Sequence, residues 1–456
     1  MPPIHEFATW EPLLWLLYTD NAERLAAPGG HVAGHISHGG WSVPVRRRSP
    51  PPGRAAQIED MQEEHDAVGR VHAALTASGI EGVAFVAEIS PAGRAVLHLI
   101  ETGPAVEPGT GGPHPGSILL VEGAVPEPWR RLPDPVDGAS PDPGADPAVL
   151  ERTLRERLPD AIGATEEEIA AAEEQLGVAL PAELKALYRV TRARWEDWDG
   201  DYDKAEPVYD AVGCELFPLD RLYIADASSR PCSWQFAAME AVVTPPDARV
   251  QGVVGSPGWI VFGDNGGGDR LAVDLTPGPR GHTGQIILLS HEENIGAELL
   301  AASLTDLVLN GENEGDGDRR PPEQPAVAYV NIHGVSSVRA AADPALEVLS
   351  IGVWEGEPVS LAPVVGLPRL RTLSAYPGTL ADPLEITELT GLEYLELGPE
   401  DWRVLLDADA VPRGLLAAGI EVHSDRHPLP VVDLANELLA RWDRPPMTRT
   451  VLEGDL

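Results

Sequence analysis

The sequence predicts an α+β protein that is divided into several domains. Three patterns in the 456-residue chain lead to this expectation. Apolar residues recur at helical spacing in residues 165–190, short apolar runs alternate with glycine-rich turns in residues 259–289, and leucines recur every 22 to 24 residues in residues 346–395. A chain of this length exceeds one ordinary hydrophobic core, so we expect two or three domains.

Residues 165–190 are expected to form a helical hairpin. Thr165 and Glu168 have the spacing of a capping box, in which each side chain satisfies a backbone N–H at a helix start. Gly177 can take the left-handed conformation that ends such a helix. Pro181 follows after a short apolar link and is favoured in the first turn of a second helix.

The segment after residue 258 is expected to form strands. The run "WIVF" at residues 259–262 is apolar, alternate residues are apolar from Leu271 to Leu275, and residues 285–289 supply a third strand. The intervening "GDNGGGDR" lacks the Lys and Ser/Thr pair that binds phosphate, which favours a tight turn. Residues 297–310 are predicted to be helical.

The order of these pieces resembles the SUKH superfamily. The matching motifs are "EEEIAAAEEQLGVALPAELKALY", "IVFGDNGGGDRLAVDL" and "LLAASLTDLV", within residues 165–309. The resemblance implies a sheet flanked by helices, no catalytic constellation, and recognition through a variable surface. The founding members of the superfamily are yeast cell-wall synthesis regulators, and its bacterial members are mostly immunity proteins against toxins. One difference is the long segment "TRARWEDWDGDYDKAEPVYDAVG", where many members have an Asn-Gly pair and a short loop.

This long segment contains the candidate partner-binding site. Aromatic rings exposed among carboxylates suit a protein interface, where ring burial gives affinity and charge steers the encounter. Two alternatives are a lid packed over the core and a calcium loop, although the segment lacks the glutamate and glycine placement of an EF-hand. The candidate residues are Trp195, Glu196, Asp197, Trp198, Asp199, Asp201, Tyr202 and Asp203.

The remaining sequence divides into further domains and linkers. Residues 1–132 are expected to form an α+β domain that we leave unassigned, and the Pro-, Asp- and Gly-rich residues 133–147 a linker. The SUKH-like domain occupies residues 148–310. An acidic and Pro-rich linker follows at residues 311–325.

Residues 326–445 resemble a short leucine-rich-repeat solenoid. In such repeats each unit contributes a strand to a curved stack, which often binds another protein. The alternative is that the repeats only pack on the central domain, and the usual Asn or Cys ladder is missing. Residues 446–456 are interpreted as a tail. Two sets of leucines carry the period, namely Leu346, Leu370 and Leu392, and Leu349, Leu373 and Leu395.

The composition restricts the possible partners. The chain contains 72 acidic residues against 33 Lys plus Arg, for a formal net charge of −39. Such a field repels nucleic acid and anionic membranes and attracts a basic protein. The alternative is that the surplus of acid only keeps the protein soluble.

The sequence gives little support for a metal site or an exported protein. Cys214 and Cys232 do not make a disulfide framework or a metal site. His31, His35 and His38 lie in a glycine-rich segment that favours a loop over a helical metal site. The first residues show neither a basic leader nor a long apolar run, so we expect no membrane span and a cytoplasmic location.

The sequence also favours binding over catalysis. No nucleophile elbow, Walker loop, zinc signature or dinucleotide fingerprint is present, so we expect no enzyme and no cofactor. A carboxylate set of Asp264, Asp269 and Asp274 is the enzyme alternative, but it has no matched base. The leading hypothesis is an immunity protein that binds and neutralises a toxin domain such as a basic nuclease. The other is a cytoplasmic scaffold or regulator that recruits a cellular partner through the repeats.

Overall fold

The protein is a mixed α+β structure with two compact units. The computed structural model describes residues 3–46, 53–54, 61–107, 117–198, 200–311, 325–353, 356–423 and 426–456. Residues Val125–Val327 form one unit, here the central unit. Met1–Ala124 and Ala328–Leu456 together form the other, here the flanking unit. Each unit has its own sheets and hydrophobic core.

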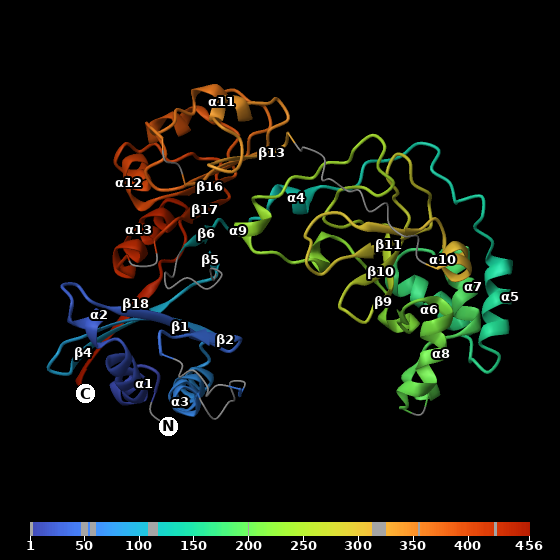
Figure 1. Ribbon diagram of the computed structural model, residues 1–456, viewed down its shortest axis with the longest axis horizontal. Helices are drawn as coiled ribbons and strands as arrows, with labels where there is room; N and C mark the ends of the chain where they lie inside the picture. Colours follow the sequence, from blue (N-terminus) through green and yellow to red (C-terminus); the bar gives the residue numbers. More distant parts are fainter. Residues whose placement is uncertain are drawn as a thin grey trace. The chain divides into compact units, whose positions relative to one another are not determined.

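The central unit is built on an antiparallel sheet with the strand order β12-β11-β10-β9-β7. The short strand β8 pairs with β9 along the same edge as β7. Figure 1 shows α5, α6, α7, α8 and α10 gathered at one side of this sheet, with α4 and α9 at the other. The strands are β7 (Glu215–Leu216), β8 (Tyr223–Ile224), β9 (Trp259–Asp264), β10 (Arg270–Asp274), β11 (Gln285–Leu289) and β12 (Glu298–Ala301).

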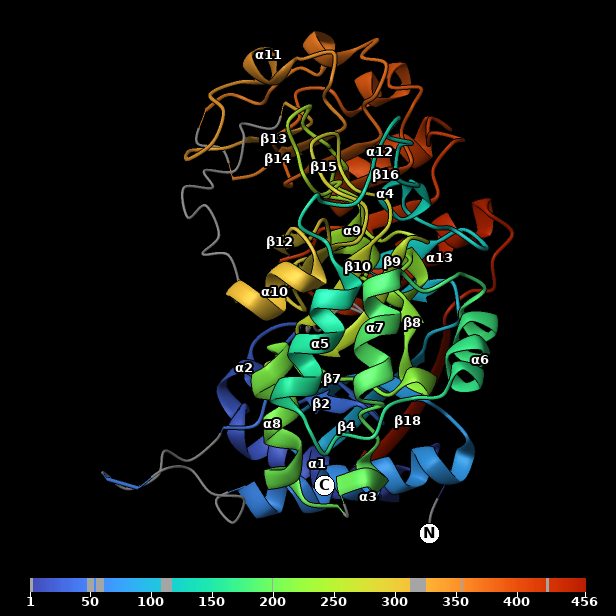
Figure 2. The ribbon, with the colours of Figure 1, turned by 90° about the vertical axis from the view of Figure 1, so that its right-hand side faces the viewer.

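Helices α5, α7 and α10 pack together against this sheet and close the core of the central unit. Figure 2 shows α5 and α7 side by side. The helices are α4 (Glu127–Arg130), α5 (Pro147–Arg157), α6 (Glu166–Leu176), α7 (Ala182–Val190), α8 (Tyr202–Val212), α9 (Trp234–Ala237) and α10 (Leu304–Asn310). The 3₁₀ turns are η2 (Trp195–Trp198), η3 (Leu219–Arg221) and η4 (Ala227–Ser229).

The local signals of the helical hairpin are confirmed. The N–H of Thr165 donates to Glu168 Oε2 at 2.8 Å, and the N–H of Glu168 donates to Thr165 Oγ1 at 3.2 Å. Gly177 ends α6 in the left-handed conformation with φ of 68°. The three predicted strands are present as β9, β10 and β11.

The predicted helix over residues 297–310 is wrong in its first half. Residues 298–301 form strand β12, which extends the sheet by pairing with β11. The helix α10 begins only after Ser303, whose hydroxyl accepts from the N–H of Asp306 at 3.0 Å. The open edge of β11 therefore outweighed the helical periodicity of the sequence.

The segment interpreted as a linker, residues 133–147, lies along the central unit. Gln251 donates to the carbonyl of Asp134 at 2.7 Å and accepts from its N–H at 2.7 Å. Asp146 caps α5 by accepting from the N–H groups of Ala148 and Val149. This segment is therefore fixed by hydrogen bonds. Most of the second predicted linker, residues 312–324, lies outside the described residues.

The flanking unit contains a five-stranded antiparallel sheet with the order β18-β4-β3-β1-β2. Helices α1 (Phe7–Asp20) and α3 (Gln62–Ser78) lie side by side beneath this sheet, and α2 (Ala22–Ala26) follows α1 (Figure 1). The strands are β1 (Val32–Ser37), β2 (Gly40–Ser42), β3 (Gly82–Ile89), β4 (Arg94–Glu101) and β18 (Thr448–Asp455).

A second sheet in the flanking unit has the order β13-β14-β15-β16-β17-β6-β5. Strands β14 to β17 are parallel, and their register places Leu349, Leu373 and Leu395 side by side. The strands are β5 (Val106–Glu107), β6 (Ile118–Leu120), β13 (Val327–Val330), β14 (Val348–Ile351), β15 (Thr372–Ala375), β16 (Tyr394–Leu397) and β17 (Ala417–Ile420). The associated helices are α11 (Val338–Ala341), η5 (Ala362–Val364), η6 (Pro383–Glu388), α12 (Pro399–Asp407) and α13 (Pro428–Arg441).

The flanking unit combines segments that were predicted to form a separate N-terminal domain, a repeat domain and a tail. Strand β17 pairs with β6, and β18, inside the segment interpreted as a tail, pairs along its whole length with β4. One core cluster joins Val86 and Ile100 to the leucines of the parallel strands. The two ends of the sequence therefore share one core.

Among the described residues, no helix is both long enough and apolar enough to cross a membrane.

Candidate functional site

The central unit has a cleft of about 700 Å³ beside strand β7. Four segments form its walls, namely η2, α8, β7 and the turn from Phe217 to Arg221. These segments come together because β7 pairs with β9 at the sheet edge, while α8 packs against β7 and η2. The lining residues are Ala193, Arg194, Trp195, Glu196, Trp198, Ala205, Glu206, Val208, Tyr209, Cys214, Glu215, Leu216, Phe217, Pro218, Asp220 and Arg221.

Aromatic rings line the cleft. The Trp195 and Trp198 rings meet edge to face, with centroids 6.3 Å apart and an interplanar angle of 89°. Trp198 packs partly against the core, which fixes the pair, whereas Trp195 is 42% exposed. Tyr209 on α8 is 43% exposed. Exposed rings held by a rigid neighbour offer contact area at low conformational cost.

Phe217 is a buried part of the lining. The Arg221 guanidinium lies 4.9 Å from its ring centroid, and that of Arg270 lies 5.7 Å from it. Both distances are within the range of cation–π attraction. The backbone carbonyl of Phe217 accepts a hydrogen bond of 2.6 Å from the buried hydroxyl of Tyr188, which anchors this wall to helix α7.

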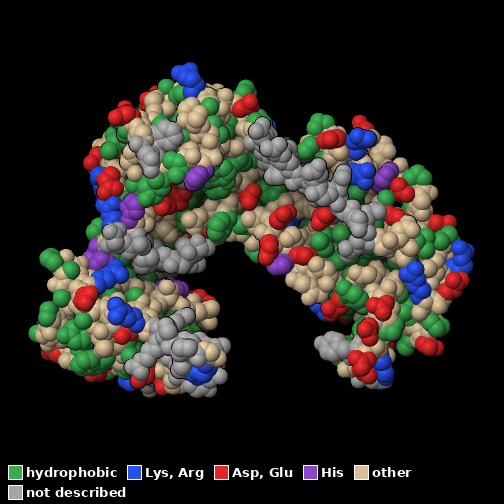
Figure 3. All heavy atoms as spheres, viewed as in Figure 1, with side chains coloured by type: hydrophobic (Ala, Val, Ile, Leu, Met, Phe, Trp, Pro, Cys, Tyr) green, Lys and Arg blue, Asp and Glu red, His purple; other side chains and the backbone are tan. Residues whose placement is uncertain are grey.

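Acidic side chains predominate around the cleft. Two arginines also line it, but Arg194 already pairs with Glu168 at 3.0 Å, which leaves the surroundings negative. Figure 3 shows acidic side chains spread over the visible face of the central unit. The acidic lining residues are Glu196, Glu206, Glu215 and Asp220.

The structure divides the predicted site residues between different roles. Trp195, Glu196 and Trp198 line the cleft. Asp197 instead receives two hydrogen bonds of 2.8 and 2.7 Å from the Arg192 guanidinium, and this pairing lowers the pKa of its carboxyl.

Asp201 and Asp203 begin helix α8. The Asp201 carboxylate caps the helix by accepting from the N–H of Asp203 at 3.1 Å, and Asp203 is exposed in the first turn. Asp199 and the side chain of Tyr202 lie outside the described residues.

Residues of the opposite walls were missed by sequence reasoning. Tyr209, Phe217 and Arg221 lie up to 26 residues from Trp195 and reach the cleft only through the pairing of β7 with β9. No local pattern in the segment "CELFPLDRL", residues 214–222, points to a binding surface.

The central unit was compared with known proteins. A family model described as the SMI1 / KNR4 family (SUKH-1) matches residues 163–310. These residues form a SMI1/KNR4 domain. All segments that line the cleft lie inside it.

Three fungal proteins are similar to part of the chain. A "Glucan synthesis regulatory protein" from Neurospora crassa is 33% identical over 100 residues, which cover 22% of this chain and 19% of that protein. A "KNR4/SMI1 homolog" from Yarrowia lipolytica is 42% identical over 60 residues, or 13% of this chain and 8% of that protein. A "Cell wall biosynthesis/cell cycle regulator smi1" from Schizosaccharomyces pombe is 40% identical over 60 residues, or 13% and 12%. The matches span less than a fifth of each relative's length.

Cys214 is the thiol in the cleft wall of the SMI1/KNR4 domain. Its side chain is fully buried, and burial, assisted by the negative charge of Glu215, raises the pKa of the thiol to about 12. A thiol with this pKa holds its proton at neutral pH and is a poor nucleophile.

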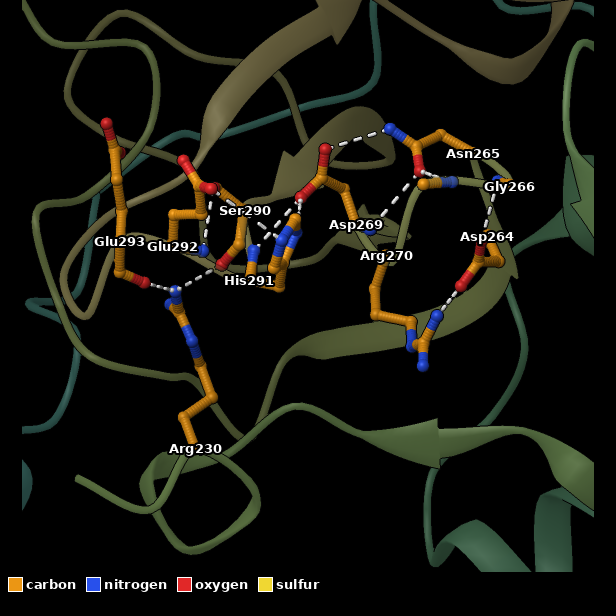
Figure 4. A network of polar contacts seen from close by, with 11 residues as sticks. Arg230, Asp264, Asn265, Gly266, Asp269, Arg270, Ser290, His291, Glu292 and Glu293 are labelled. Carbon is orange, nitrogen blue, oxygen red and sulfur yellow. Dashed lines mark hydrogen bonds and ion pairs between the residues drawn. The ribbon is translucent and has the colours of Figure 1, made fainter. Parts of the chain in front are cut away.

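The β9–β10 turn of the SMI1/KNR4 domain is held by its own polar groups (Figure 4). Asp264 pairs with Arg270 and accepts from the N–H of Gly266 at 2.6 Å. Asp269 accepts from Asn265 Nδ2 at 2.8 Å and from His291 Nδ1 at 2.7 Å. The predicted tight turn is therefore formed, with its carboxylates used to fix it.

Asp274 lies away from the other two acidic residues of the enzyme alternative, Asp264 and Asp269, which share the β9–β10 turn. Asp264 is opposite Arg270 at one end of the β9–β10 ladder, whereas Asp274 is opposite Trp259 at the other end. This separation follows from the antiparallel register of the hairpin.

The histidines considered as metal ligands have different neighbours in the flanking unit. The His31 ring contacts the His427 ring, with centroids 4.3 Å apart and an interplanar angle of 47°, and His38 Nδ1 lies 3.2 Å from His72 Nε2. Burial lowers the pKa of His35. Within the described ranges of the chain, no group of three or more His, Cys, Asp or Glu residues could hold a metal ion.

Proposed function

We propose that the protein is a non-catalytic binding module that captures a segment of a basic partner protein in the cleft of its SMI1/KNR4 domain. The observation that carries this proposal is the combination of exposed aromatic rings with an acidic lining in one cleft of about 700 Å³. Aromatic anchors in a pocket supply most of the affinity at protein interfaces, and complementary charge supplies orientation and association rate.

In this proposal the protein acts by covering a surface of its partner and catalyses no reaction. A partner side chain that enters the cleft would bury Trp195 and Tyr209, which are both more than 40% exposed. Basic residues beside it would meet Glu206 and Glu215. The net charge of −39 would steer a basic protein toward the molecule from a distance of about one Debye length, roughly 8 Å at physiological salt.

An immunity role is the first candidate. In this role the partner is a toxin domain, such as a basic nuclease, whose active face is covered on binding. The support is the acidic cleft and the resemblance of the domain to a superfamily with many immunity proteins.

A regulatory role in the cytoplasm is the second candidate. The support is that two of the relatives carry the printed names "Glucan synthesis regulatory protein" and "Cell wall biosynthesis/cell cycle regulator smi1". The parallel strands β14 to β17, with leucines in register, would then act as a short leucine-rich-repeat surface that recruits a cellular partner.

The proposal is tested by affinity capture with matched variants of the full chain. The tagged wild type is compared with Trp195→Ala and with Glu206→Lys/Glu215→Lys, which change exposed lining residues. Asp160→Lys/Asp247→Lys is the control for the same added positive charge, since Asp160 and Asp247 are exposed and do not line the cleft. Each preparation is captured from native cells at low and high salt, and bound proteins are identified by mass spectrometry.

The proposal is supported by a basic protein that the wild type and Asp160→Lys/Asp247→Lys retain and that the cleft variants bind about tenfold more weakly (about 1.4 kcal/mol). Retention should weaken at high salt, because salt screens exposed charges. If all variants retain the same partners equally, the cleft is not the binding site. Inhibition of a captured nuclease or other toxin selects the immunity role. Ser350 and Ser374 lie opposite each other in β14 and β15. Capture of a cellular protein that the Ser350→Arg/Ser374→Arg variant no longer binds selects the regulatory role.

A further inference from the structure

Strand β18 forms an exposed edge of the five-stranded sheet. It is eight residues long, pairs with β4 from Thr448 to Asp455, and is the outermost strand of this sheet among the described residues. Val451, in its middle, is 45% exposed. A long edge strand presents a row of backbone donors and acceptors that can pair with another chain.

The register of the ladder identifies the backbone groups that point outward. The N–H of Leu456 donates to the carbonyl of Gly93 at 2.9 Å, so the backbone N–H of residue 456 points toward β4. The carbonyl of Arg94, which is opposite Asp455, accepts from Ser90 on the other side at 2.9 Å. Alternate residues of an antiparallel strand point to opposite neighbours. The residues whose backbone N–H and carbonyl groups point away from β4 are therefore Arg449, Val451, Glu453 and Asp455.

The side-chain charges of these residues are complementary when two copies of β18 pair with each other. If two copies of β18 pair antiparallel about Val451, Arg449 lies opposite Glu453 of the partner subunit on both sides of the centre. The two central valines then cover each other. A centre at Glu453 would put two glutamates opposite each other, and a centre at Arg449 two arginines. Such like-charge pairs are destabilising across strands.

We propose that the protein forms a two-fold symmetric dimer in which β18 pairs with β18 of a second copy, with the axis at Val451. The two five-stranded sheets become one continuous sheet, and the interface uses the same residues on both subunits, as two-fold symmetry requires. Glu453 then lies between Arg94 of its own chain, with which it already pairs, and the partner's Arg449. The dimer is independent of the cleft proposal, because β18 belongs to the flanking unit.

The backbone part of the proposal is tested with Val451→Pro in the full chain. Proline lacks an N–H, but the N–H of Val451 points away from β4, so the substitution removes no bond within the sheet. Sedimentation velocity of the wild type in about 0.15 M salt should show a dimer that forms as the concentration rises from about 1 to about 100 µM. This range covers the dissociation constants typical of modest interfaces. Val451→Pro should weaken the dimer at least tenfold, about 1.4 kcal/mol, with an unchanged circular dichroism spectrum.

The register is tested by charge exchange. Arg449→Glu alone and Glu453→Arg alone each place like charges opposite each other and should be monomeric where the wild type is dimeric. A mixture of the two variants restores both opposite-charge pairs and should dimerise within about threefold of the wild type, or about 0.7 kcal/mol. Arg413→Glu is the control for Arg449→Glu, because Arg413 is exposed, lies outside β18 and its substitution gives the same change in net charge.

Three results would overturn the dimer. These are a wild type that stays monomeric up to about 100 µM, a Val451→Pro variant that dimerises as the wild type does, and a mixture of the charge variants that gains nothing over each variant alone.

Discussion

Asp274 should make the SMI1/KNR4 domain less stable as the pH rises from about 4 to about 7. Its side chain has no exposed surface, and burial raises the pKa of its carboxyl from 3.8 to about 6. It accepts hydrogen bonds from Trp259 Nε1 at 3.0 Å, from Gln285 Nε2 at 2.8 Å and from the N–H and hydroxyl of Thr276 at 2.8 and 3.2 Å. These four donors favour the ionised form but do not offset the loss of water.

The sign follows from the two pKa values. In the unfolded chain Asp274 loses its proton near pH 3.8, and in the folded chain only near pH 6. Between these values the folded state binds more protons, so the free energy of unfolding falls as pH rises. The cost is absent below about pH 3.8 and complete above about pH 6. At about 1.36 kcal/mol per pH unit, the interval corresponds to about 3 kcal/mol.

The assay compares the wild type with Asp274→Asn. Urea unfolding of both proteins is measured between pH 4 and pH 7, and the difference between their unfolding free energies cancels the titration of other groups. This difference should shift by about 2.5 kcal/mol against the wild type over the range, because more than half of the unfolded chains have already lost this proton at pH 4. The indole N–H resonance of Trp259, identified by its absence in Trp259→Phe, should titrate with a midpoint near pH 6 and stop titrating in Asp274→Asn.

A flat difference together with an indole resonance that does not move between pH 4 and pH 8 would refute the reasoning. The carboxylate would then be ionised throughout, and the four hydrogen bonds would outweigh its burial.

Two further predictions concern backbone and hydrogen-bond geometry in the same domain. Gly163→Ala should lower the unfolding free energy by about 3 kcal/mol or more, because its Cβ would lie 2.1 Å from the carbonyl oxygen of Arg189. Gly177→Ala, at φ of 68° with open space around the Cβ, should cost only about 1–2 kcal/mol, and equal denaturation midpoints for both variants would contradict this. Tyr188→Phe should cost about 1–3 kcal/mol in urea unfolding, because the buried carbonyl of Phe217 loses its donor; an unchanged midpoint would mean that water replaces the hydroxyl.

Features that depend on a few neighbouring residues were predicted well from the sequence. The capping box of Thr165 and Glu168 and the left-handed Gly177 are fixed by the backbone within one helical turn. The hairpin of β9 and β10 was predicted for the same reason, since its turn is built from residues 264–270 and their own side chains.

Features that depend on a distant partner were predicted poorly. The segment 298–301 has helical periodicity, and only the free edge of β11 makes it a strand. Half of the candidate cleft was missed in the same way, because Phe217 and Tyr209 approach Trp195 only when the sheet edge has formed. In the predicted loop, the equal spacing of the aspartates concealed that Asp197 pairs with Arg192 while Asp201 caps a helix.

The flanking unit shows why such pairings can be made across an inserted domain. Strand β4 pairs with β18, and β6 with β17, although residues 125–327 form a unit of their own between the two halves. The entropy of closing a loop rises only with the logarithm of its length, by about 0.6 kcal/mol for each doubling. The central unit therefore needs no pairing with the flanking sheets to form its cleft, and the flanking sheets can present β18 whatever the cleft binds.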